Sequence, residues 1–102
     1  MENEAVQSWK RATEVDPKFH RPWLNLGKLA LRRGRAEEAV TYLEKAHSLD
    51  RNTFEPTYQL SLAYRRLGRA AEADRFRRLA DTLRRGDPRN QIGTGNSPDE
   101  TP

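Results

Sequence analysis

The sequence predicts an all-α protein of five helices, arranged as antiparallel pairs and followed by a disordered tail. Three observations support this prediction: a repeat of 34 residues, apolar residues at helical spacing within each repeat, and glycine and proline at the ends of the predicted helices. The chain has 102 residues, of which 34% are hydrophobic and 33% are charged. Such a composition suits one small domain with a thin core.

The repeat appears when residues 20–53 are shifted onto residues 54–87, which gives eleven identities in 34 positions. The same shift places the first nineteen residues on the second half of the first full repeat. Repetition at this period is typical of proteins that stack identical helical units. We therefore predict one helical domain over residues 1–86, composed of a half repeat, 1–19, and two full repeats, 20–53 and 54–86.

Each full repeat is predicted to form a helix, a turn and a second helix. Trp23, Leu26 and Ala30 are spaced at i, i+3 and i+7, as on one face of a helix. Gly34 and Gly68 mark the end of each first helix, because a left-handed residue after a helix is least costly as glycine. The chain then reverses and begins the second helix of the pair.

The half repeat and the tail complete the prediction. The half repeat is a single helix, about Glu2–Val15, which ends before Pro17 because the residue preceding a proline resists helical geometry. Residues 87–102 contain one apolar residue, Ile92, among many turn-forming residues. Such a segment buries too little to offset its ordering entropy, so we expect it to be disordered.

Small residues inside the helices indicate where two helices approach most closely. Glycine within a helix costs about 1 kcal/mol relative to alanine, so Gly27 is expected to have a packing reason. We predict that Gly27 faces Ala39 where the first and second helices of the pair cross.

These positions resemble the tetratricopeptide repeat, a helix–turn–helix family of 34 residues, over about residues 4–85. In the first full repeat the matching residues are Trp23, Leu26, Gly27, Ala39, Leu43 and Ala46, and Ala30 replaces the usual tyrosine. In the second, Leu60, Tyr64, Ala73 and Ala80 match. Arg77 there replaces a large apolar residue, and we expect Phe76 to fill that space. The resemblance implies a right-handed α-solenoid whose first helices line a concave groove.

The same resemblance identifies candidate groove residues, which are largely basic: Arg21, Leu24, Asn25, Lys28, Arg32, Tyr58, Leu62, Arg65 and Arg66. Arginine binds carboxylates through two parallel hydrogen bonds. The basic groove residues therefore predict a module that binds an acidic peptide or helix of a partner protein. A solvated helix face with internal ion pairs is the alternative. Glu55 and Gln59 stand where the family's clamp for chaperone C-termini needs basic residues, which argues against such a clamp.

Two alternative functions remain open. The chain is also compatible with the C-terminal end of a longer repeat protein that self-associates, because Val6 and Trp9 lie on a second helix that lacks its first helix. The net charge is +4 and most of the basic residues are arginine, which is compatible with binding to nucleic acid. Acidic residues interrupt the arginine clusters and no row of stacking aromatics accompanies them, so nucleic-acid binding is the weaker alternative.

Several other classes find no support in the sequence. There is no cysteine, and we expect His20 and His47 to be separate surface residues rather than metal ligands. No nucleophile with a base and no phosphate-binding glycine motif is found, so we predict neither an enzyme nor a cofactor. No apolar run is long enough to span a membrane, no signal peptide is visible, and the compartment stays unassigned.

Overall fold

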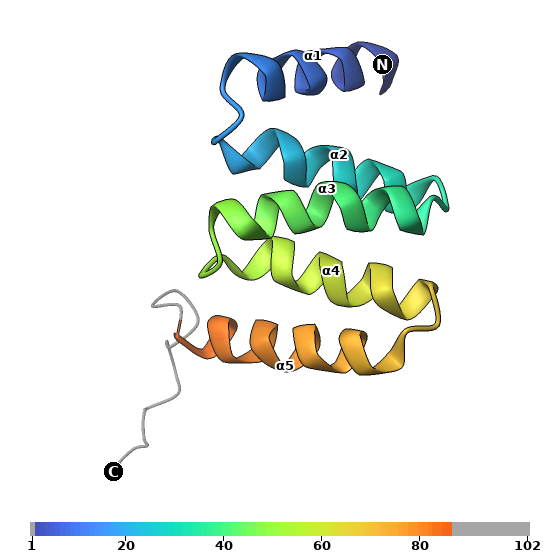
Figure 1. Ribbon diagram of the computed structural model, residues 1–102, viewed down its shortest axis with the longest axis vertical. Helices are drawn as coiled ribbons and strands as arrows, with labels where there is room; N and C mark the ends of the chain where they lie inside the picture. Colours follow the sequence, from blue (N-terminus) through green and yellow to red (C-terminus); the bar gives the residue numbers. More distant parts are fainter. Residues whose placement is uncertain (1, 87–102) are drawn as a thin grey trace.

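The computed structural model describes residues 2–86, which form five α-helices joined by short turns. The helices are α1 (Glu2–Val15), α2 (His20–Arg32), α3 (Ala36–Leu49), α4 (Phe54–Arg66) and α5 (Ala70–Gly86). They stack in chain order, and each helix reverses the direction of the one before it (Figure 1). Residues 2–86 contain no strand, so the predicted all-α fold of five helices is confirmed. The predicted disordered tail, residues 87–102, lies outside the described residues.

Glycine ends the first helix of each pair, as predicted. Gly34 and Gly68 have φ values of 75° and 76°, in the left-handed region that favours glycine. The Gly34 N–H donates to the Leu31 carbonyl at 3.0 Å, and the Arg35 N–H donates to the Ala30 carbonyl at 2.9 Å. The same pair of bonds recurs 34 residues later. This Schellman arrangement satisfies carbonyls at the helix end and turns the chain toward the next helix.

Proline marks the other helix boundaries. The first helix, α1, ends at Val15, two residues before Pro17, as the sequence predicts. Pro22 and Pro56 each occupy the third position of their helices, α2 and α4. A backbone N–H at that position has no partner within the helix, so proline is tolerated there.

The core lies along the stack and is thin, as the composition predicts. The most extensive contacts join α2 to α3 and α4 to α5, and α3 joins the two pairs by packing on α4. Leu24, Leu43 and Leu60 are the largest apolar side chains that are completely buried. Ala46 and Ala80, 34 residues apart, are also completely buried, which indicates close helix approach at both positions.

Gly27 permits the closest approach of α2 to α3, but its nearest neighbour is not the predicted Ala39. A Cβ atom added at Gly27 would lie 2.5 Å from both Cγ and Cδ2 of Leu43, and its three nearest contacts all belong to Leu43. The difference has a simple cause, because helical side chains point toward the N-terminus and cover the turn before their own Cα atom. Leu43 therefore covers the region of α3 that the sequence assigned to Ala39.

Phe76, which the sequence predicts to fill the space beside the arginine at position 77, packs against Tyr64. Its ring stacks on the ring of Tyr64, with centroids 5.6 Å apart and planes inclined by 8°. Tyr64 is 5% exposed and its hydroxyl donates a hydrogen bond to Glu44. Arg77 instead points outward and pairs with Asp81 at 3.5 Å. The stacked pair thus forms an apolar contact between α4 and α5.

The half repeat is less well covered than its counterpart. Within residues 2–86, α1 packs on α2 alone, whereas α3 packs on both α2 and α4. Trp9 is accordingly half-buried, while the equivalent residue in the first full repeat, Leu43, is completely buried. The uncovered side of α1 is the main departure from a regular stack.

Candidate partner-binding face

The predicted groove residues lie on α2 and α4, and these two helices also contact one another directly. On α2 they recur at i, i+4, i+7 and i+11, which places them along one helix face. We use the name α2–α4 face for Arg21, Asn25, Lys28, Arg32, Tyr58, Leu62, Arg65 and Arg66. All eight side chains are at least partly exposed.

Leu24 does not belong to this surface. Its side chain is 0% exposed and forms part of the main core cluster with Leu43 and Leu60. Removing a leucine from water is favourable by about 1.5–3 kcal/mol, so its position is explained by folding alone. The sequence prediction that Leu24 contacts a partner is therefore wrong, because its side chain is enclosed in the core cluster.

Glu55 neutralises part of the positive charge on the α2–α4 face. Its Oε2 atom lies 2.6 Å from Lys28 Nζ, and its Oε1 atom lies 3.5 Å from Arg21 Nη1. One carboxylate of α4 thus joins two cations of α2. All three side chains are partly exposed, and ion pairs of this kind contribute at most about 1 kcal/mol each. Arg21 and Lys28 are therefore already paired within the chain.

Of the remaining cations on this face, one forms a hydrogen bond within the chain and two form neither a hydrogen bond nor an ion pair within residues 2–86. Arg66 Nη1 donates a hydrogen bond of 2.6 Å to the Leu31 carbonyl, near the C-terminal end of α2. A positive charge is favourable there because of the helix dipole. Arg32 and Arg65 are exposed, and their guanidinium groups have no hydrogen bond or ion pair to any residue in 2–86. These two arginines are the groups of this face that remain available to bind an anion.

Aromatic rings engage several arginines of α5 that the sequence suggested as contacts for nucleic acid. The guanidinium carbon of Arg84 lies 4.8 Å from the ring centroid of Phe54, and that of Arg77 lies 5.9 Å from the ring of Tyr58. The two rings stack on each other at 5.4 Å. Cation–π contacts of this kind stabilise the packing of α5 on α4. Arg77 and Arg84 are therefore part of the helix packing.

The two histidines lie on different helices, and both are half-buried. His20 begins α2, whereas His47 lies late in α3 with its ring edge-on to Phe76 at 5.6 Å. The His47 Nε2 atom is buried without a hydrogen-bond partner among the described residues. Burial lowers the pKa of His47, and the nearby charge of Arg51 lowers it further, against a smaller opposing effect of Glu44. The neutral imidazole is thus the form that the fold favours.

Acidification should consequently destabilise the protein through His47. Its pKa in the folded chain lies below the ordinary value of 6.5, so the unfolded chain binds the proton more readily. The stabilisation is complete above pH 6.5 and is lost as the pH falls below that value. Chemical denaturation between pH 7.5 and 5.5 should show a smaller loss of unfolding free energy for His47→Gln than for the original chain. Equal losses in the two proteins would contradict this assignment.

The predicted self-association residues are less exposed than the sequence suggests. Val6 and Trp9 are both half-buried, and Val6 contacts a pocket against α2. The most exposed large apolar residues among the described residues are Val15 at 78%, Phe19 at 50% and Leu79 at 37%. Val15 and Phe19 flank the turn between α1 and α2. Exposed apolar surface in the half repeat therefore centres on this turn rather than on Val6.

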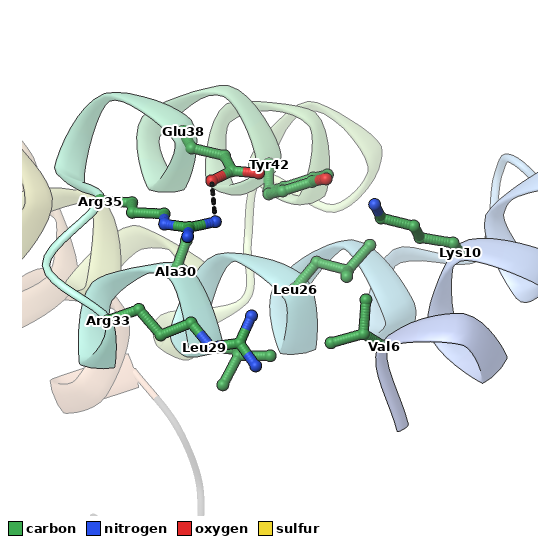
Figure 2. Close-up of a pocket in the computed structure, with 9 residues that line it drawn as sticks. All are labelled: Val6, Lys10, Leu26, Leu29, Ala30, Arg33, Arg35, Glu38 and Tyr42. Carbon is green, nitrogen blue, oxygen red and sulfur yellow. Dashed lines mark ion pairs between the residues drawn. The ribbon is translucent and has the colours of Figure 1, made fainter. Parts of the chain in front are cut away.

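A pocket that the sequence did not predict lies between α1, α2 and α3. Its floor includes Leu26, Leu29 and Ala30 of α2, and Tyr42 of α3 lies on one side (Figure 2). The signal that could have found it is Ala30, which stands in the first full repeat where Tyr64 stands in the second. A small residue at a position otherwise occupied by a ring leaves space.

Among residues 2–86 no group of three or more histidine, aspartate or glutamate side chains is placed to hold a metal ion. Over the same residues, no helix combines the length and the apolar character needed to cross a bilayer.

Comparison with known families agrees with the stack of helix pairs. A family model described as tetratricopeptide repeat matches residues 19–85, which is more than half of the chain. The chain belongs to the tetratricopeptide repeat family. Members of this family are generally non-catalytic scaffolds for protein–protein interaction, and the match spans the helix pairs α2–α3 and α4–α5. The search of curated proteins finds no match.

Proposed function

We propose that this protein is a non-catalytic scaffold that binds an acidic peptide or helix of a partner protein on its α2–α4 face. The observation that carries the proposal is the state of Arg32 and Arg65. Both are exposed on adjacent helices, and neither guanidinium has a partner within residues 2–86. A guanidinium that forms no intramolecular pair can bind a carboxylate without first losing an existing contact.

The neighbouring side chains fit the same kind of ligand. Asn25 and Leu62 are half-buried and offer a hydrogen-bonding amide and an apolar contact beside the arginines. Glu55, held by Arg21 and Lys28, would repel a second carboxylate at that end of the face. We therefore place the acidic group of the partner near Arg32 and Arg65, with its apolar side chains toward Leu62.

Charge reversal at both arginines should weaken binding by at least about tenfold, because each charge-assisted hydrogen bond contributes about 1.5–3 kcal/mol. The measurement is fluorescence anisotropy with acidic decapeptides that alternate glutamate and leucine, comparing the original chain with Arg32→Glu/Arg65→Glu. The melting temperature should stay nearly the same, since both side chains are exposed.

A matched control makes the same change of net charge elsewhere. Arg11 and Arg78 are exposed on α1 and α5, outside the α2–α4 face, so Arg11→Glu/Arg78→Glu should retain most of the binding. Equal loss in the two double variants would mean that only net charge matters. Tighter, steeply salt-dependent binding to a single-stranded oligonucleotide would instead favour the nucleic-acid alternative.

Self-association through the half repeat is a second candidate. It is favoured by the incomplete cover of Trp9, compared with complete burial of the equivalent Leu43, and by the exposure of Val15 and Phe19. A second copy that packed on the uncovered side of α1 would bury more of Trp9. Sedimentation equilibrium should then show a dimer that Trp9→Glu dissociates, and a concentration-independent monomer would exclude it.

A further inference from the structure

The pocket between the half repeat and the first full repeat has the features of a binding site. It has a volume of ≈ 80 Å³, several times the volume that one water molecule needs. Val6 and Lys10 reach it from α1, and the turn between α2 and α3 contributes Arg33 and Arg35 (Figure 2). The remaining lining residues are Leu26, Leu29, Ala30, Glu38 and Tyr42.

The chain itself shows which group fits this place. Thirty-four residues on, Ala30 corresponds to Tyr64 and Tyr42 corresponds to Phe76. In that second copy of the site the two rings stack, with centroids 5.6 Å apart and planes inclined by 8°. The first copy keeps the receiving ring, Tyr42, but carries only a methyl group where the inserted ring should begin. The space is thus the vacancy of an aromatic side chain.

The packing around the pocket is consistent with such a vacancy. The contact between α1 and α2 is less extensive than the equivalent contact between α3 and α4. Leu29 is larger than its counterpart, Ala63, and fills part of the space, but the pocket persists. The contact between α1 and α2 therefore lacks the ring that Tyr64 supplies at the equivalent contact between α3 and α4.

The charged residues around the pocket differ from those at the equivalent positions of the second repeat. This difference indicates the charge that a ligand should carry. Glu44, which accepts the hydrogen bond of Tyr64, is replaced by Lys10, and Leu67 is replaced by Arg33. Arg35 pairs with Glu38 at 3.8 Å, and Arg33 also has an interaction within the chain, so Lys10 is the lining cation that a ligand can meet. A ring that enters here should meet a cation where the ring of Tyr64 meets a carboxylate.

We propose that this pocket binds an aromatic side chain flanked by acidic residues, contributed by a peptide segment of another protein. The inserted ring takes the place that Tyr64 occupies in the second repeat and stacks on Tyr42, and a flanking carboxylate lies near Lys10. The chain's own tail does not fit this description, since residues 87–102 contain no phenylalanine, tyrosine or tryptophan. The pocket shares no residue with the α2–α4 face, so the proposal is independent of the function proposed for that face.

The test uses three capped tripeptides as probes and follows the backbone amide signals of the full chain by nuclear magnetic resonance. Acetyl-Glu-Tyr-Glu-amide should cause saturable shifts at Leu29, Ala30 and Tyr42. Acetyl-Glu-Ala-Glu-amide, which lacks the ring, should cause none there. Acetyl-Lys-Tyr-Lys-amide should bind more weakly by about fivefold, the upper range for one exposed ion pair. Absence of saturable shifts with the first peptide overturns the proposal.

Two variants separate the roles of the ring and of the charge. Ala30→Tyr fills the pocket from within and should abolish the shifts at Leu29 and Tyr42, whereas Ala30→Ser keeps the space and should retain them. Lys10→Glu, on the exposed side of α1, does not depend on repacking and should reverse the preference between the acidic and basic peptides. Undiminished binding to Ala30→Tyr, or an unchanged preference in Lys10→Glu, would show that the peptide binds elsewhere.

Discussion

Truncating Leu43 to alanine should lower the free energy of unfolding by about 2–5 kcal/mol, because a completely buried leucine leaves a cavity between tightly packed helices. The same truncation should also change the effect of Gly27→Ala. In the original chain a Cβ at Gly27 would lie 2.5 Å from Leu43, so the substitution should destabilise through overpacking, which typically costs about 1–3 kcal/mol. With alanine at position 43 that clash is removed.

A double-mutant cycle measures this coupling. In the Leu43→Ala background, Gly27→Ala should become stabilising by up to about 1 kcal/mol, the difference in helix propensity between the two residues. Urea denaturation of the four proteins gives the interaction energy, which should reach at least about 1 kcal/mol for residues in direct contact. Additive effects would mean that Gly27 is required for a reason other than its contact with Leu43.

Replacing Tyr64 by alanine should have a comparable effect, lowering the free energy of unfolding by about 3–5 kcal/mol. The ring is 5% exposed, stacks on Phe76, and donates its hydroxyl to Glu44. Its removal should also create a pocket in the second repeat like the one at Ala30. Thermal and urea denaturation measure the loss, and a loss below 1 kcal/mol would mean that the stacked pair contributes little to the core.

Tyr64→Phe is the matched control, since it keeps the ring and removes only the hydroxyl. The expected loss is about 1 kcal/mol, the typical net contribution of one hydrogen bond. Burial, followed by the hydrogen bond to Glu44, raises the pKa of Tyr64 to about 12. The tyrosine of the unfolded chain has the ordinary pKa of 10, so the original chain should lose stability as the pH rises from 10 toward 12. Tyr64→Phe should lack this part of the loss.

The contrast between Ala30 and Tyr64 shows which features the repeat pattern can predict and which it cannot. Aligning the two repeats identifies the substitution at once, because it compares equivalent positions of one chain. The alignment does not show whether neighbouring side chains close the space. Leu29 is larger than Ala63 and fills it in part, and only the packed structure shows that a pocket of ≈ 80 Å³ is left.

Local rules were sufficient where a feature depends on the backbone alone. The two left-handed glycines, the end of α1 before Pro17 and the five helices follow from backbone geometry and helical periodicity, which act within a few residues.

The candidate binding face was predicted only in part, because its properties depend on contacts between helices that are distant in sequence. Periodicity placed most of its residues on one surface, yet it could not show that Glu55 pairs with Arg21 and Lys28, or that Leu24 is completely buried. Those outcomes depend on how α2 sits relative to α3 and α4, and a displacement of a few ångströms would break the ion pairs.

The sequence by itself determined the helices, their order and the positions where they pack closely, since these follow from short-range geometry repeated every 34 residues. The tertiary structure alone decided which cations are free, which residue faces Gly27, and where the stack leaves a space. These features depend on the direction and size of side chains that come into contact from different helices. The periodicity of the sequence does not predict such contacts.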